Sequence, residues 1–138
     1  ECTAEQAYTW SKGKAVFASG SPFDPVTYRN RTFVPGQGNN AYIFPGVGLG
    51  VIVSRSRVVT DEMFLAAAHS LAEQVKDSDI ERGRVYPPLS AIRQVSAKIA
   101  ADVAQMAYDN GFTDKPEPED VLAEMQEYMY RPVYPHYV

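Results

Sequence analysis

The chain has 138 residues, of which 45% are hydrophobic and 22% are charged, and its formal net charge is −4. These values are typical of one packed domain and argue against a nucleic-acid-binding protein. One cysteine, Cys2, excludes an internal disulfide, His69 and His136 form no metal-ligand pattern, and no apolar run has the ~18–20 residues of a membrane span.

A helix and a strand are predicted at the start of the chain. Thr3 and Gln6 have the spacing of a capping box, which predicts a helix from there to about Ser11. Gly13 is placed to end this helix. The apolar run at residues 14–19 is then typical of a buried strand in a parallel sheet.

The turn at residues 20–22 ends this strand and is a candidate wall of a binding site. Ligands of open α/β sheets bind just outside the carboxyl ends of the strands. A plain exit from strand to loop is the alternative. Residues 22–38 then form a long excursion, in which a small hairpin is expected around Arg29 and Asn30. Long loops in compact domains are often functional.

The stretch at residues 36–46 is the strongest candidate for a ligand loop. Its glycines lead into Asn39 and Asn40, which stand directly before an apolar run. Asparagine is a preferred helix N-cap, and the start of a helix carries a partial positive charge that suits anions. A cap that binds no ligand is the alternative interpretation.

Two glycine patterns near this stretch are rejected as phosphate-binding loops. Residues 36–41 satisfy G-x-G-x-x-A, but Pro35 spoils the strand that should precede the motif and no acidic residue follows on a later strand. The glycines at positions 46, 48 and 50 lie inside the apolar run at residues 41–53. We expect that run to be a helix buried all round, with glycines that let it approach its neighbours closely.

Two further helices follow. Thr60 is expected to cap a helix at about residues 61–76, and Ser90 to cap the next helix, which ends before Gly111. Residues 77–84, between these two helices, are polar and are predicted to be mobile. A stiff connection follows at residues 86–88. The predicted core faces are Phe64, Ala67, Ala68, Leu71 and Val75 on the first helix, and Ile92, Val95, Ile99, Val103 and Met106 on the second.

The end of the chain is a linker, a short helix and a tail. The linker covers residues 115–120, and the helix continues to about Tyr128. Residues 129–138 are rich in aromatic residues and proline, so they cannot form a core of their own. We expect this tail to lie across its own domain or across a neighbouring subunit.

Four motifs occur in an order that resembles the malic enzyme family. They are Glu1-Cys2-Thr3-Ala4-Glu5-Gln6-Ala7-Tyr8, Ala18-Ser19-Gly20-Ser21-Pro22-Phe23, Pro35-Gly36-Gln37-Gly38-Asn39-Asn40 and Tyr86-Pro87-Pro88-Leu89. The resemblance implies an α/β fold, namely the C-terminal portion of a Rossmann-like NAD(P)-binding domain, helix-rich with few strands. It covers residues 1–138, including a C-terminal helix and tail at about residues 116–138.

The resemblance also implies a reaction and roles for single residues. Malic enzymes oxidise L-malate with NAD or NADP and decarboxylate it to pyruvate and CO2, with a divalent Mg or Mn ion. By analogy, Asn39 lies near the nicotinamide of the cofactor and Asn40 hydrogen-bonds malate. Ser19, Gly20 and Ser21 are expected to wall the cofactor cleft.

The family's catalytic tyrosine and lysine, its acidic metal ligands and its phosphate-binding glycine loop are not found in these residues. We therefore expect no catalytic residue and no metal ligand in this chain, which would be inactive alone. The first residue is Glu1 and not Met, which suggests a piece of a longer chain. Its expected partners are the rest of the parent chain and further copies in a homo-oligomer, with neither nucleic acid nor a membrane.

One alternative of a different class remains open, a free-standing helical interaction module. In that case the aromatic tail and the apolar run at residues 41–53 would be docking surfaces. The expected location is the cytoplasm, with an organelle matrix as the second choice. The choice between NAD and NADP is left open, because the residues that meet the adenosine ribose are not in the chain.

Overall fold

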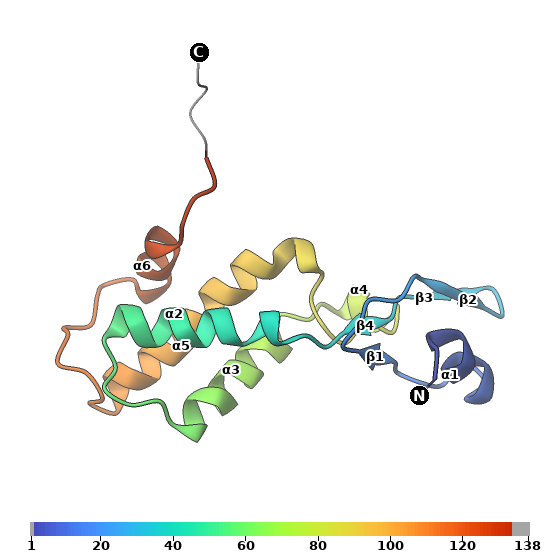
Figure 1. Cartoon of the computed structure of the whole chain (residues 1–138), viewed down its shortest axis with the longest axis horizontal. Coiled ribbons are helices and arrows are strands. Elements are labelled where there is room, and N and C mark those ends of the chain that lie inside the picture. The colour runs from blue at the N-terminus through green and yellow to red at the C-terminus, as the bar shows by residue number, and fades with distance from the viewer. Residues whose placement is uncertain (1, 134–138) are drawn as a thin grey trace, which may run out of the picture.

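The computed structural model describes residues 2–133, so Glu1 and residues 134–138, with His136 and half of the predicted tail, lie outside it. Figure 1 shows most of the helices gathered at one end of the molecule and α1 with the strands at the other. No helix within residues 2–133 is long and apolar enough to cross a membrane. The elements are α1 (Ala4–Trp10), β1 (Ala18–Ser19), β2 (Val26–Tyr28), β3 (Arg31–Phe33), β4 (Gly36–Gln37), the 3-10 helix η1 (Asn40–Tyr42), α2 (Phe44–Ser54), α3 (Asp61–Glu73), α4 (Asp77–Ile80), the 3-10 helix η2 (Leu89–Ala91), α5 (Ile92–Asp109) and α6 (Val121–Tyr128).

Helix α1 begins with the predicted capping box. The backbone N–H of Gln6 donates to Thr3 Oγ1 at 3.2 Å, and the backbone N–H of Thr3 donates to Gln6 Oε1 at 2.9 Å. Gly13 follows the helix with a φ of +79°, as expected of a C-terminal glycine. The buried Tyr8 ring stacks on Phe33, with 4.4 Å between ring centroids, and so joins α1 to the hairpin.

The strand predicted at residues 14–19 is shorter and more exposed than expected. Only Ala18 and Ser19 form ladder pairs, with Gly36 and Gln37 of β4 respectively, and the pairing is parallel. Val16 is 66% exposed. Within the part of the chain that the structure describes, β1 has a neighbour on one edge alone, so nothing here buries both faces of the strand.

The hairpin predicted around Arg29 and Asn30 is confirmed. Strands β2 and β3 pair antiparallel, and the two turn residues have φ values of 48° and 63°. Positive φ at both central residues is the requirement of a type I′ turn, whose twist matches that of the flanking strands.

Helix α2 packs against α5 through two of its glycines, as predicted. A Cβ added at Gly46 would lie 2.6 Å from Ile99 Cγ2, and one added at Gly50 would lie 2.6 Å from the carbonyl oxygen of Ala100. Both distances are shorter than any contact that a Cβ makes, so these two positions require glycine. A Cβ added at Gly48 would have no other atom within 4 Å.

The opposite face of α2 contradicts the expectation of a helix buried all round. Phe44 is 58% exposed and Ile52 is 62% exposed. The run is apolar on every face, and therefore only the neighbouring elements decide which side is covered. Pro45 lies in the first turn of α2, where its missing N–H costs no intrahelical hydrogen bond.

Helix α5 carries the predicted core stripe. Val95, Ile99 and Val103 are buried, while Ile92 and Met106 pack against the same core and are partly exposed. The predicted cap at Ser90 is wrong. Residues Leu89–Ala91 form η2, and α5 starts at Ile92 without a side-chain cap, because the chain leaves Pro88 in a tighter 3-10 turn. Gly111 follows the helix at a φ of +65°, as expected.

Helix α3 contacts α5 by a face slightly rotated from the predicted one. Ala67 and Leu71 are buried as expected, but Met63 is fully buried whereas Phe64 is 41% exposed. Met63 and Phe64 are adjacent in the sequence and lie about 100° apart around the helix. The buried face is therefore centred closer to Met63 than the sequence pattern predicted. Thr60 has extended backbone at the cap position but its side chain makes no capping hydrogen bond.

The segment predicted as polar and mobile contains the one-turn helix α4 and is tied to the rest of the fold. Arg84 Nη1 and Asp79 Oδ1 form an ion pair of 3.1 Å in which both side chains are mostly buried. The backbone N–H of Val34 donates to the carbonyl of Arg82 at 2.9 Å. These contacts tie residues 77–84 to the approach to residues 86–88, and the mobility of the segment stays a prediction.

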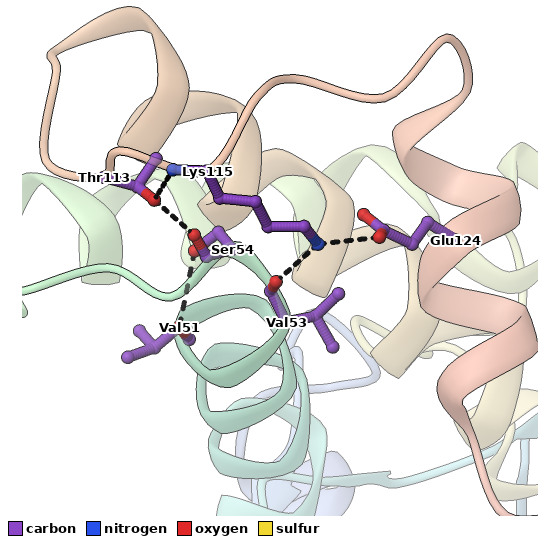
Figure 2. Close-up of polar contacts among 6 residues, drawn as sticks. All are labelled: Val51, Val53, Ser54, Thr113, Lys115 and Glu124. Atoms are coloured by element: carbon purple, nitrogen blue, oxygen red, sulfur yellow. Dashed lines mark hydrogen bonds and ion pairs between the residues drawn. The ribbon is translucent and has the colours of Figure 1, made fainter.

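Thr113 and Lys115 donate hydrogen bonds to the carbonyl groups at the C-terminal end of α2 (Figure 2). Thr113 Oγ1 donates to the carbonyl of Ser54 at 2.6 Å, and Lys115 Nζ donates to the carbonyl of Val53 at 2.7 Å. The same ammonium group pairs with Glu124 Oε1 of α6 at 2.6 Å. A cation at a helix C-terminus is favourable, because the last carbonyls have no intrahelical partner.

The short C-terminal helix and the start of the tail follow the prediction. Asp120 Oδ1 accepts from the backbone N–H of Ala123 at 2.8 Å and so caps α6, which ends at Tyr128. Arg93 Nη2 then donates to the carbonyl of Tyr130 at 2.8 Å. The first residues of the tail therefore contact the chain's own α5.

We expect Gly50→Ala to destabilise the protein by about 1–3 kcal/mol, because the new methyl group would overlap with the backbone of α5. Gly48→Ala is the matched control on the same helix, and we expect it to be neutral or stabilising by up to ~1 kcal/mol. Urea unfolding of both variants measures the difference. Equal effects at the two positions would contradict the close approach of the helices.

We expect Lys115→Met to cost about 1–3 kcal/mol, because it leaves a helix carbonyl and the Glu124 carboxylate without their shared donor. Lys98→Met is the control, since Lys98 forms a half-exposed i,i+4 pair with Asp102 within one helix, which should contribute no more than about 0.5 kcal/mol. Thermal unfolding at matched ionic strength distinguishes the two. If Lys98→Met cost as much as Lys115→Met, the bridge between α2 and α6 would be no stronger than a surface pair.

Candidate functional site

The two loops predicted to form a site meet at the carboxyl ends of β1 and β4. The parallel ladder continues past the strands, because the backbone N–H of Gly38 donates to the carbonyl of Ser19 at 2.8 Å. Gln37 Nε2 donates to the carbonyl of Gly20 at 3.3 Å. The turn at residues 19–21 and the loop at residues 38–40 are thus neighbours, at the edge of a parallel sheet where ligands of α/β proteins bind.

The two asparagines differ in what their side chains do. Asn39 Oδ1 accepts from the backbone N–H of Ala41 at 2.9 Å, which makes Asn39 the N-cap of η1. The side chain of Asn40 forms no hydrogen bond with any residue in the described range, and both side chains are exposed. The cap therefore uses one amide oxygen and leaves the Asn40 amide free for a ligand.

The turn at residues 19–21, directly before Pro22, is held by a hydrogen bond between a serine side chain and the backbone. The N–H of Ser21 donates to Ser19 Oγ at 3.4 Å, so the first hydroxyl closes the turn. Gly20 and Ser21 are exposed, and Ser19 is half-buried. The turn thus offers small side chains and open backbone next to the asparagine loop.

A cleft of about 510 Å³ lies beside the asparagine loop. It contains Asn39 and Asn40, whereas Ser19, Gly20 and Ser21 lie beside its edge and do not line it. Its walls come from η1, from α3 and from the segment before Pro87. The lining residues are Gly38, Asn39, Asn40, Tyr42, Ile43, Ala68, Leu71, Ala72, Val85 and Tyr86.

Tyr42 and Tyr86 are parts of the site that the sequence analysis did not identify. Their rings stack with 5.4 Å between centroids. Tyr42 is only 2% exposed, and its hydroxyl donates to the carbonyl of Pro87 at 2.6 Å. Burial raises the pKa of Tyr42 and so strengthens its preference for the neutral phenol. The stiff Tyr-Pro-Pro sequence was the available signal, but it did not indicate which way the ring faces.

The chemistry of the cleft is that of neutral groups. Its lining offers amides, phenols and apolar side chains, and it includes no carboxylate, imidazole, amine or guanidinium. Within residues 2–133 there is also no cluster of three His, Cys, Asp or Glu side chains that could hold a metal ion. These residues can bind and orient a polar or anionic group, and a proton acceptor for catalysis would come from elsewhere.

Comparison with known proteins agrees with this arrangement. A sequence model of the malic enzyme NAD binding domain matches residues 1–108. An NADP-dependent malic enzyme of Populus trichocarpa is 55% identical over 99% of this chain and 23% of its own length, and one of Phaseolus vulgaris is 56% identical over the same shares. A chloroplastic NADP-dependent malic enzyme of Zea mays is 53% identical over 99% of this chain and 22% of its own length.

The chain therefore spans less than a quarter of the length of these relatives. The predicted fold class, a helix-rich α/β portion of a nucleotide-binding domain with few strands, agrees with the matched model and with the observed elements. The chain belongs to the malic enzyme family and contains part of its NAD binding domain.

Proposed function

We propose that this chain supplies the cofactor- and substrate-contacting loops of a malic enzyme. The parent enzyme would oxidise and decarboxylate L-malate to pyruvate and CO2 with NAD(P) and a divalent Mg or Mn ion. The observation that carries this proposal is the meeting of residues 19–21 and 38–40 at the carboxyl ends of two parallel strands. A free-standing interaction module, the alternative, has no comparable observation in its favour.

Asn40 is the proposed substrate contact. Its side chain borders the cleft, is exposed and has no partner among the described residues. An amide N–H2 is a suitable donor for a carboxylate of malate, and a hydrogen bond to a charged group contributes about 1.5–3 kcal/mol.

Asn39, Ser19, Gly20 and Ser21 are the proposed cofactor contacts. The residues fit a nicotinamide, because its carboxamide needs neutral donors and acceptors such as the Asn39 amide and the serine hydroxyls. The small turn at residues 19–21 leaves room beside the loop, since a Cβ added at Gly20 would meet nothing closer than 4.0 Å. We propose NADP as the cofactor, since the relatives are named NADP-dependent.

The catalytic groups and metal ligands would come from the rest of the parent chain. When bound, the nicotinamide accepts a hydride and the metal ion polarises the carbonyl of the oxidised substrate. The part of this chain that the structure describes contributes neutral groups at the cleft and no three-acid cluster. Its task is thus to hold and orient malate and cofactor.

The remaining assignments concern the chain as a part of a larger molecule. We propose that residues 1–138 are the C-terminal segment of a Rossmann-like NAD(P)-binding domain, with about residues 116–138 as its C-terminal helix and tail. The rest of the parent chain and further copies in a homo-oligomer would be its partners, without nucleic acid or a membrane. The cytoplasm and an organelle matrix are both proposed locations, and the relative from maize is named chloroplastic.

In the full-length parent enzyme, we expect Asn40→Ala to lower kcat/KM for malate by roughly 10- to 100-fold through loss of a hydrogen bond to a carboxylate. Asn39→Ala should act more on the KM for the cofactor and should also lower the melting temperature, because it removes the cap of η1. Steady-state kinetics with each substrate varied in turn measure both effects.

Asp120→Ala is the matched control, because Asp120 caps α6 in the same way and is not part of the cleft. It should cost ~1 kcal/mol of stability and leave both Michaelis constants unchanged. If Asn40→Ala had the same kcat/KM for malate as the wild type, the assignment of Asn40 as the substrate contact would be wrong. If Asn39→Ala behaved like Asp120→Ala, Asn39 would be a cap alone.

We expect the isolated 138-residue chain to show no oxidation of malate with NAD or NADP and any divalent metal ion. The cleft can position a ligand, but without a base, an acid and metal ligands it cannot complete the reaction. Cofactor reduction, followed by absorbance at high protein concentration, is the measurement. Turnover above the background without protein would show that the catalytic groups lie within this chain.

A further inference from the structure

The segment before Pro87 places an aromatic ring against the asparagine loop. A Cβ added at Gly36 would lie 3.3 Å from Tyr86 Cδ2, and one added at Gly38 would lie 3.1 Å from Tyr86 Oη and 3.4 Å from Cζ. The ring therefore runs along the loop from Gly36 to Gly38, and its hydroxyl end reaches the residue directly before Asn39.

Gly38 is a glycine for reasons of space and not of backbone conformation. It is absent from the glycines with positive φ, so alanine could adopt its backbone angles. What an added methyl group would meet is the phenol of Tyr86. The contact between Gly38 and Tyr86 is thus a close fit between a ring and a bare backbone.

The ring itself is firmly held. Tyr86 stacks on the buried Tyr42, and the hydroxyl of Tyr42 donates to the carbonyl of Pro87 at 2.6 Å. Tyr42 ends η1, and Pro87 follows Tyr86 in the chain, so the two rings connect both ends of the loop to the same rigid segment. Proline at positions 87 and 88 restricts the backbone further.

We propose that Tyr86 is a positioning residue for the proposed reaction, acting through Asn39 and Asn40. Its ring packs against the loop at residues 36–40 and so determines the positions of the two side-chain amides relative to the cleft. This inference rests on the proposed function of the asparagines. Displacement of a binding group by about 1 Å can cost up to about 100-fold in rate, so a ring that only supports the loop has a large effect on turnover.

The test is a double-mutant cycle in the full-length enzyme. Gly38→Ala should lower kcat/KM for malate by roughly 10- to 100-fold, because the methyl group pushes against the Tyr86 hydroxyl and shifts the loop. In the Tyr86→Phe background the Gly38→Ala change should cost no more than about 3-fold, since without the hydroxyl the nearest ring atom lies at 3.4 Å from the added Cβ.

Tyr86→Leu removes the ring, and hydrogen exchange provides a readout other than activity. We expect faster amide exchange in peptides covering residues 36–42 and a lower kcat/KM for malate, while Tyr86→Phe keeps the exchange of the wild type. Asp120→Ala, which removes the cap of α6, is the control for a loss of stability outside the loop. It should lower the melting temperature without selectively increasing exchange at residues 36–42.

The outcomes separate this inference from the proposed function. If Tyr86→Leu speeds exchange in the loop while Asn39→Ala and Asn40→Ala leave the kinetics unchanged, the ring supports the loop but the proposed function fails. Unchanged exchange in Tyr86→Leu, or failure of Tyr86→Phe to rescue Gly38→Ala, overturns the inference and leaves the asparagine roles standing. A loss in Tyr86→Phe as large as in Tyr86→Leu also overturns it, because the hydroxyl would then contact the ligand directly.

Discussion

The close approach of α2 to α5 is the constraint on which the rest of the structure depends. Gly46 and Gly50 bring the two helices together at a distance that no side chain at these positions would permit. Because α2 starts two residues after η1, this packing fixes one end of the asparagine loop. The parallel pairing of β1 with β4 fixes the other end. The candidate site lies between two elements that cannot shift independently.

The site that results from this arrangement is a cleft lined by neutral groups. The side-chain oxygen of Asn39 caps η1, whereas the side chain of Asn40 has no hydrogen-bond partner among the described residues. The phenol of Tyr42 donates to the carbonyl of Pro87, and burial raises its pKa. A binding surface of this kind suits a chain that covers less than a quarter of its relatives, where holding the ligands and performing the chemistry can be separate tasks.

Local features were predicted well because their causes are local. The capping box at Thr3, the turn at Arg29 and Asn30, and the glycine after α5 each depend on residues within a few positions of one another. The core stripe of α5 follows from its 3.6-residue period. The candidate site residues came from motifs that resemble a family, and the structure brings their two loops together, while their proposed roles are still predictions.

By itself the sequence determined the helix-rich α/β class, the main helices and the hairpin, and the family. It could not determine which face of a uniformly apolar helix is covered, because burial of Phe44 or Ile52 depends on neighbours and not on periodicity. It also could not show that Tyr42 donates to the carbonyl of Pro87, or that the Tyr86 ring lies against Gly38. Only the tertiary structure decided these points, since each joins segments whose separation in space no local pattern encodes.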